Sequence, residues 1–209
     1  MTVDYYAIPV TVTEIVLKTK PMPRHPIPAN ALHAHYATTG GHADCYAADA
    51  PAPVSLAAFV HAFTTSPLFR LERWILAVVL GRPSTDAEAK AVAAGDAPFD
   101  RPWAGGPLDQ LGTGARFAAW TVEARSEWQL VMCDYQGRTR SWFMVQPGEP
   151  TRVYFGTAIA AGPSRRGSAA PQDERKKRIP FAFRLLMPFH RLYSRALLWS
   201  AVRGLRATV

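Results

Sequence analysis

The sequence predicts an α+β fold in which an antiparallel sheet curls around a long C-terminal helix. The first observation is a run of short segments with alternating apolar residues between residues 115 and 160. The second is a long amphipathic segment, residues 178–206, which follows a basic linker. A sheet that curls around a helix often encloses a cavity, so the pattern also favours a ligand-binding site between the two.

The chain has 209 residues, the length of one domain with a substantial core. Apolar residues make up 48% and charged residues 19%, which is usual for a globular protein. We divide the chain into an N-terminal extension, residues 1–40, and a folded domain, residues 41–209. Four prolines within residues 21–30 predict that the extension is partly irregular.

The folded domain begins with a short strand over residues 42–49 (HADCYAAD), which follows a turn at two glycines. Three helices come next, and a loop over residues 96–114 connects them to the rest of the sheet. Capping residues mark the helices: Ser55, Ser66 with Pro67, and Thr85 with Glu88 at the starts, and Gly81 and Gly95 at two of the ends.

Four further strands are predicted, at residues 116–123, 127–134, 139–146 and 151–160. Their connections are short, so neighbouring strands should be antiparallel. In the third of these strands, Trp142 and Met144 alternate with Phe143 and Val145. Both faces of the sheet are therefore apolar, and we expect one face to be covered and the other to line a cavity.

The last helix is predicted to begin near Ile179 and Pro180 and to cover residues 180–205. Pro188 lies inside it and should kink it or split it in two. The apolar stripe expected to face the sheet consists of Phe181, Leu185, Phe189, Leu192, Ala196 and Trp199.

Lysine and arginine number 24 against 16 acidic residues, a formal net charge of +8. Six of these basic residues lie in an insertion, residues 163–179, which has almost no apolar side chains and should be mobile. Two explanations of the basic charge stay open. It belongs to a solvated linker and the outer face of a helix, or it makes a weak contact with an anionic membrane surface.

The only cysteines are Cys45 and Cys133, which do not suggest a disulfide scaffold. The first twenty residues lack a basic region before an apolar run, and no stretch reaches the roughly 18 apolar residues of a membrane-spanning helix. We therefore expect a cytoplasmic protein.

The candidate ligand-binding residues are Trp128, Trp142 and Tyr154 of the sheet, with His190 and Tyr193 of the last helix. Aromatic side chains supply apolar walls, and a histidine can orient a ligand by a hydrogen bond or serve as a general base. The alternative is that these residues belong to an ordinary core.

Asp134 and Glu127 are the candidate acid–base residues, because desolvation in a cavity raises the pKa of a carboxyl group. The alternative is that both carboxylates lie in turns or face outward. Arg138 and Arg140 flank the same turn, and we predict that they pair with Asp134 across the hairpin.

His33, His35, His42, Asp44 and Cys45 are residue types that bind zinc, but their spacing does not match a structural zinc site. The chain has no dinucleotide-binding or phosphate-binding glycine motif, no GxSxG, no HExxH and no CxxC. Its basic linker lacks interleaved aromatic residues. We therefore expect no metal, no cofactor and no nucleic-acid partner.

Four segments carry a resemblance to a known family: HADCYAAD, FTTSPLFRLERWIL, SEWQLVMCDYQGRTRSWFMV and RLLMPFHRLYSRALL. In this order they resemble the START-like (SRPBCC, polyketide cyclase-like) helix-grip superfamily, which includes polyketide cyclases and lipid-transfer proteins. Within it, they are most similar to a bacterial domain family of unknown function. The resemblance covers residues 41–205 and implies a helix-grip fold with a cavity between sheet and helix. It implies no catalytic residue.

Three functions remain in view, and the oligomeric state is open. The first is binding of a small hydrophobic or aromatic molecule in the cavity. The second is a cyclase-like enzyme that acts on a polyketide-type or other apolar substrate. The third is a peripheral membrane or protein-interaction module. A buried, convergent polar pair in the cavity would favour the enzyme, a wholly apolar cavity the binder, and a filled core the interaction module.

Overall fold

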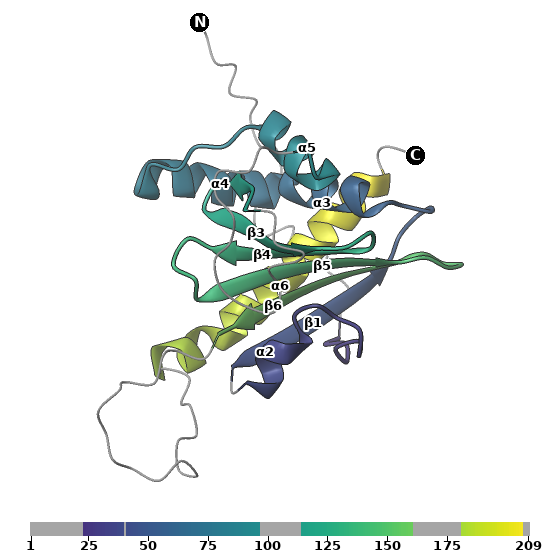
Figure 1. Ribbon diagram of the computed structural model, residues 1–209, viewed down its shortest axis with the longest axis horizontal. Coiled ribbons are helices and arrows are strands. Elements are labelled where there is room, and N and C mark those ends of the chain that lie inside the picture. Colours follow the sequence, from purple (N-terminus) through teal and green to yellow (C-terminus); the bar gives the residue numbers. More distant parts are fainter. Residues whose placement is uncertain (1–22, 40, 97–113, 161–180, 207–209) are drawn as a thin grey trace, which may run out of the picture.

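A six-stranded antiparallel sheet runs through the described part of the chain, with helices packed against it (Figure 1). The structure is a computed structural model that describes residues 23–39, 41–96, 114–160 and 181–206, with side chains in the last range from Met187 onward. The predicted α+β class and the antiparallel pairing of consecutive strands are confirmed.

The strands lie in the spatial order β1-β6-β5-β4-β3-β2. Their bounds are β1 His42–Asp49, β2 Arg116–Phe117, β3 Trp120–Arg125, β4 Gln129–Asp134, β5 Thr139–Gln146 and β6 Arg152–Ile159. The predicted strand at residues 116–123 is in fact two strands. The chain reverses at Ala118, whose φ of 52° is unusual for a non-glycine residue, and pairs Phe117 with Trp120.

The first strand pairs with the last one along its whole length, from His42 opposite Ile159 to Asp49 opposite Arg152. This pairing joins two segments that are more than a hundred residues apart in the sequence. It places the acidic Asp44 opposite Thr157, which becomes important below.

The three predicted helices are present, as α3 (Leu56–Thr64), α4 (Pro67–Leu80) and α5 (Asp86–Ala94). Each starts where its sequence predicts, because a side-chain oxygen accepts a hydrogen bond from a free backbone N–H of the first turn. These capping residues are Ser55, Ser66 and Thr85, and Glu88 completes a capping box in α5. Gly81 and Gly95 adopt the left-handed conformation that ends α4 and α5.

The last helix, α6 (Phe181–Arg206), continues through Pro188. Of the two outcomes predicted for this proline, a kink or a split, the split does not occur. The predicted apolar stripe was wrong over part of the helix. Phe189 is 69% exposed and Leu192 is also exposed. The face that packs into the core carries Ala196, Leu197, Leu198, Ala201, Val202 and Leu205.

One face of the sheet forms the main core together with α3 and α6. Phe63 of α3 is fully buried, and its ring centroid lies 4.8 Å from that of Phe143 and 4.6 Å from that of Phe155. Helix α6 crosses this face of the sheet diagonally (Figure 1) and contributes the apolar face described above.

The opposite face of the sheet is covered by residues 23–39, which belong to the predicted N-terminal extension. They include the short helix α2 (Ala34–Thr38), which lies beside β1 (Figure 1). Ala31 of this segment packs with Trp142, Met144 and other sheet residues in a second apolar cluster. The sheet is therefore covered on both faces, which explains its apolar residues at odd and even positions alike.

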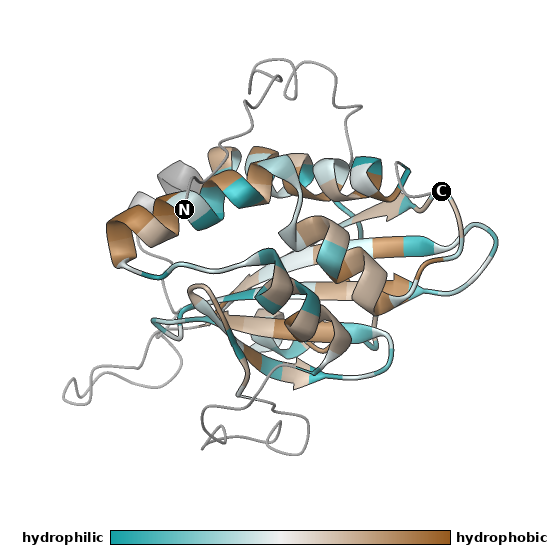
Figure 2. Ribbon diagram, turned by 90° about the horizontal axis from the view of Figure 1, so that it is seen from above, coloured by the Kyte–Doolittle hydropathy of each residue, from teal (hydrophilic) through white to brown (hydrophobic). Residues whose placement is uncertain are grey.

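The second half of α4 extends beyond the core. Its final turns, next to the loop that leads to α5, are strongly apolar (Figure 2). The exposed apolar residues there are Trp74, Ile75, Val78, Val79 and Leu80, and Val79 is 70% exposed.

Some expectations lie outside the described residues: the mobility of the basic insertion at 163–179, the start of the last helix near residues 179 and 180, and most of the predicted loop at 96–114. Within the described ranges, no helix combines the length and the apolar character that crossing a lipid bilayer requires.

Candidate functional site

A cavity of about 190 Å³ lies between the sheet and helices α3, α4 and α6. Much of its wall is aromatic, with Phe63 and Phe69 from the helices and Trp120 and Phe155 from the strands. The rings of Phe69 and Trp120 are 5.3 Å apart, so the wall is continuous there. Its polar residues come from several elements: Glu72, Thr139, Arg140, Ser141, Thr157, His190, Tyr193 and Ser194.

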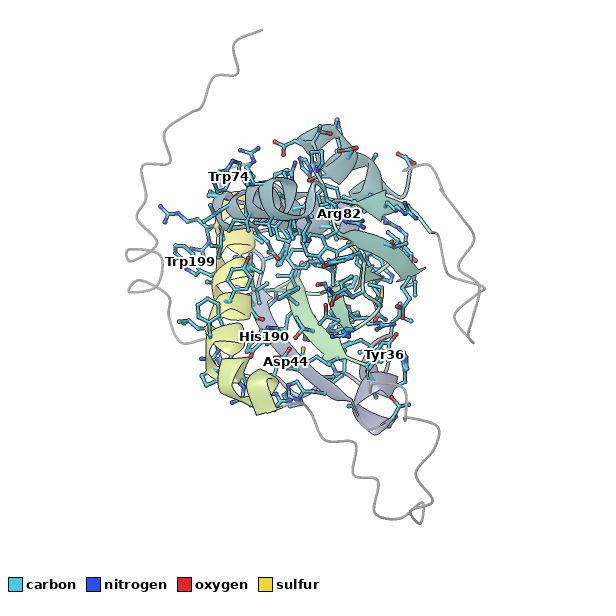
Figure 3. The ribbon with its side chains drawn as sticks, turned by 90° about the vertical axis from the view of Figure 1, so that its left-hand side faces the viewer. Tyr36, Asp44, Trp74, Arg82, His190 and Trp199 are labelled. Carbon is cyan, nitrogen blue, oxygen red and sulfur yellow. The ribbon has the colours of Figure 1, made fainter. Side chains whose placement is uncertain are left out.

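His190 joins the cavity to a buried carboxylate through Thr157. The carboxylate is that of Asp44, which is completely buried and accepts hydrogen bonds at Oδ1 from the Thr157 main-chain N–H at 3.1 Å and hydroxyl at 2.7 Å. Because the hydroxyl gives its proton to Asp44, it accepts from Nε2–H of His190, also at 2.7 Å. Figure 3 shows His190 reaching from α6 toward Asp44 on β1.

This arrangement fixes both the tautomer and the charge of His190. Burial lowers its pKa, the carboxylate of Asp44 acts in the opposite direction, and the Arg191 charge lowers the pKa further. The net shift is downward, so the imidazole is neutral near pH 7 and carries its proton on Nε2. His190 Nε2 lies 3.7 Å from the second oxygen of Asp44, Oδ2.

A second polar pair lies in the cavity wall where α4 meets α6. The hydroxyl of Tyr193 donates to Oε2 of Glu72 at 2.5 Å. Burial raises the pKa of the Glu72 carboxyl, although the hydrogen bond from Tyr193 acts in the opposite direction. Burial, and then the charge of Glu72, raise the pKa of Tyr193. Tyr193 is therefore the hydrogen-bond donor of the pair.

The structure does not bring the five predicted ligand-binding residues together. His190 and Tyr193 line the cavity, but Trp142 and Tyr154 lie on the opposite face of the sheet. The reason is the two-residue period of a strand, which sends Phe143 and Phe155 toward the helices and their neighbours Trp142 and Tyr154 away from them. The prediction that all five residues line one cavity was therefore wrong.

Trp142 has a structural environment of its own. It is completely buried, stacks on His33 with ring centroids 4.2 Å apart, and donates from Nε1 to Oε1 of Gln129 at 2.9 Å. Gln129 also receives the N–H of Leu32 and donates to the carbonyl of Asn30. These bonds fasten the N-terminal segment to the sheet.

Trp128, which is 39% exposed, and Tyr154 line a second, more open cavity of about 390 Å³ on that opposite face. The N-terminal segment forms its other wall, with His25, Pro26 and Pro28 among the lining residues. Two of its polar groups are hydrogen-bonded within the protein: Tyr154 donates to Gln146, and Gln129 holds the N-terminal segment.

The candidate acid–base residues line neither cavity. Asp134 ends β4 and accepts from the Arg138 main-chain N–H and the Thr139 hydroxyl, at 2.8 Å and 2.9 Å, which is a turn-stabilising role. Glu127 is exposed between β3 and β4. The predicted pairing of Arg140 with Asp134 was wrong, because its Nε donates to the buried carboxylate of Glu123 at 2.9 Å.

Among the residues of the hydrogen-bonded pairs, sequence reasoning missed Glu72 and Thr157, and it considered Asp44 only as a possible metal ligand. Glu72 had a signal, because it interrupts the apolar stripe of a predicted helix, four residues after Leu68. Asp44 had one too, as a charged residue in the middle of an otherwise apolar strand. Thr157 had none, since threonine is common in strands.

The residues of the considered metal motif do not assemble. Cys45 faces the side of the sheet opposite to Asp44, His33 contacts only the main-chain oxygen of Asp44, at 3.2 Å, and His35 is exposed. Burial raises the pKa of the Cys45 thiol to about 12. No three histidine, cysteine or acidic side chains of the described residues are placed to hold a metal ion.

The two polar pairs and the aromatic wall make the cavity beside His190 the best candidate site in the described part of the chain. Its chemistry is that of a small apolar pocket with a neutral histidine and a carboxylate. Comparisons with models of protein families, with curated proteins and with solved structures found no match to this chain.

Proposed function

We propose that the protein binds a small, mainly apolar molecule in the cavity between the sheet and helices α4 and α6. The observation that carries this proposal is the aromatic wall of the cavity, formed by Phe63, Phe69, Trp120 and Phe155. Two hydrogen-bonded pairs, His190 with Thr157 and Tyr193 with Glu72, add a few fixed polar groups to it. Apolar walls supply most of the affinity in such a site, and a few fixed polar groups orient the ligand.

The volume of the cavity limits the size of the ligand. An apolar cavity of about 150 Å³ is large enough to bind benzene. The cavity of about 190 Å³ therefore suits a molecule with one ring and a small substituent. This size favours a one-ring ligand over a polycyclic, polyketide-type molecule.

The proposal extends to the fold. We place the chain among helix-grip proteins of the START-like type, because α6 crosses one face of an antiparallel sheet and packs beside β1 and β6. The cavity lies where a helix-grip fold encloses its ligand, between the sheet and the long C-terminal helix. An experimental structure in which α6 leaves the sheet would contradict this placement.

The experiment that tests the function starts with protein purified from its own host. Native mass spectrometry should detect a retained molecule, and a panel of one-ring compounds should bind in calorimetry. Ser141→Leu extends an apolar side chain into the cavity from β5 and should abolish binding. Trp128→Ala, on the opposite face, is the matched control and should bind as the unchanged protein does. Binding that survives Ser141→Leu, or no binding at all, would rule out this cavity.

Acid–base catalysis is the second candidate function, because polar pairs that converge on a cavity are the feature expected of an enzyme. It is favoured by the chain of hydrogen bonds from His190 through Thr157 to the buried Asp44. A neutral histidine held in one tautomer is suited to take a proton from a bound substrate, and the nearby carboxylate would stabilise the resulting imidazolium. If the retained molecule is converted during incubation, His190→Gln should stop the conversion while binding persists. A retained molecule that never changes would leave binding as the function.

A membrane contact is a separate proposal, favoured by the exposed apolar end of α4. Trp74, Val78 and Val79 would enter the headgroup region, and the net charge of +8 would draw the protein to anionic lipids. Sedimentation with phosphatidylserine vesicles should recover the protein, and Val78→Asp with Val79→Asp should prevent it. Equal recovery of both proteins would exclude this contact.

A further inference from the structure

The cavity carries negative charge in a protein that is positively charged as a whole. Glu72 is the only carboxylate in its described lining, and Asp44 lies directly behind Thr157. The only arginine or lysine in that lining is Arg140. Its charge is already matched, because its Nε donates to Glu123 and its Nη1 donates to the carbonyl of Gly137 at 2.6 Å.

The other titratable groups at the cavity do not balance Glu72. His190 from α6 is neutral near pH 7, and Tyr193 is a neutral hydrogen-bond donor. Among the described residues, no lysine, arginine or histidine forms an ion pair with Glu72. A largely desolvated carboxylate without a cation is costly, which is the physical reason that burial raises the pKa of Glu72.

Aromatic rings share the cavity with this carboxylate. Phe69 lies on the same helix, one turn before Glu72, and its ring is 5.3 Å from that of Trp120 and 5.5 Å from that of Phe63. Phe155 continues the wall, 4.6 Å from Phe63. The faces of aromatic rings attract cations, and several rings around one carboxylate are a favourable site for an ammonium group.

We propose that the ligand of this cavity is an organic cation, an amine or ammonium group carried on an apolar body of about one ring. Glu72 is the counter-ion and hydrogen-bond acceptor, and Tyr193 holds its carboxylate in place. The aromatic wall receives the ring and the rest of the cation. This inference rests on the proposed function, because it names the class of molecule that the same cavity binds.

Three probes of matched size test the charge: benzylammonium, benzyl alcohol and benzoate. Calorimetry with the full chain at pH 7 should show benzylammonium binding about tenfold more tightly than benzyl alcohol, and benzoate binding least. Glu72→Gln keeps the shape of the side chain and removes its charge. It should reduce the preference for benzylammonium over benzyl alcohol to about one.

The control is Glu127→Gln, which removes an exposed carboxylate outside the cavity lining and should change none of the three affinities. The inference is overturned if benzylammonium does not bind, if it binds no better than benzyl alcohol, or if its advantage survives Glu72→Gln. Should Glu72→Gln fail to fold, the order of the three probes on the unchanged protein still decides. If the protein binds benzyl alcohol but not benzylammonium, and Ser141→Leu blocks that binding, the inference of a cationic ligand is overturned while the proposed binding function stands. The inference and the proposed function can therefore fail separately.

Discussion

Thr157 and His190 meet at 2.7 Å, between Oγ1 on the last strand and Nε2 on the last helix. The same hydroxyl is 2.7 Å from Asp44, so one threonine connects a cavity-lining histidine to a fully buried carboxylate. The donors and acceptors are matched along this chain: Asp44 accepts, Thr157 donates to Asp44 and accepts from His190, and His190 donates. The connection predicts how this part of the protein responds to mutation.

Thr157→Val should lower the free energy of unfolding by about 1–3 kcal/mol, because it removes the hydroxyl that donates to the buried Asp44 carboxylate and accepts from His190. Asp44 would keep the Thr157 main-chain N–H and a long contact of 3.4 Å from the Tyr46 hydroxyl. Thr157→Ser keeps the hydroxyl and should recover most of the loss. Urea unfolding measures all three proteins, and equal stability of the valine and serine variants would contradict the hydrogen-bonded link.

His190→Ala should weaken ligand binding by about tenfold and change the melting temperature little, because Thr157 keeps its bonds to Asp44. Calorimetry and thermal unfolding on one preparation give both quantities. His35→Ala removes an exposed imidazole and is the control. A lower melting temperature with unchanged affinity would show that His190 is a structural residue and would remove it from the site.

The stability of the fold should decrease as the pH falls from 7 to 5. Burial lowers the pKa of His33 to about 4 and also lowers the pKa of His42 and His190. In the unfolded chain these groups take up a proton near pH 6.5, whereas in the folded chain they resist it. Stability is therefore complete above about pH 6.5 and is lost as the pH falls toward 4.

His33 alone accounts for about 2 kcal/mol of this loss between pH 7 and pH 5, given its folded pKa of about 4. Urea unfolding at the two pH values measures the difference. His33→Gln should reduce the difference by about that amount, and His35→Gln, at an exposed position, should not. An unchanged pH dependence in His33→Gln would show that His33 titrates normally in the folded protein.

Gly156→Ala should destabilise the fold by about 1–3 kcal/mol, because there is no space for a methyl group. A Cβ at this position would lie 2.6 Å from the main-chain oxygen of Asp44, 2.9 Å from His33 Nε2 and 2.9 Å from the Trp142 ring. Gly204→Ala is the matched control. There the nearest atom is 3.9 Å away, in Ala62, and the helical position gains from alanine. Thermal unfolding compares the two, and a Gly156→Ala protein as stable as the original would mean that the strand can shift.

The local structure of this chain was predictable because neighbouring residues decide it. Ser55, Ser66 and Thr85 can satisfy free N–H groups of the helix start wherever the helix lies in the fold, so all three helix starts were predicted correctly. The alternation of apolar residues likewise gave the bounds of β1 and β5. Ala118 broke this rule, because a tight reversal between two alanines has no glycine or asparagine to mark it.

The choice of face could not be made from the sequence, because α6 and the strands have apolar residues on more than one side. Phe189 and Leu197 both look suitable for a core, yet only Leu197 meets the sheet, and Phe189 is exposed. Trp142 and Phe143 are both large and apolar, but Trp142 packs against residues 23–39 and Phe143 packs against the helices. The periodicity of apolar residues shows how many faces of a helix or strand are apolar, but the elements that pack against each face decide whether it is core, cavity wall or surface.

Sequence by itself determined the α+β class, the helix caps and the candidacy of His190 and Tyr193, since each depends on residue type and short-range spacing. The tertiary structure decided the site. It brought Glu72 to Tyr193 and Asp44 to Thr157, pairs separated by more than a hundred positions. Such pairs form only when the first strand joins the last and α4 meets α6. Contacts of this kind are set by the packing of whole elements, and no local pattern in the chain encodes them.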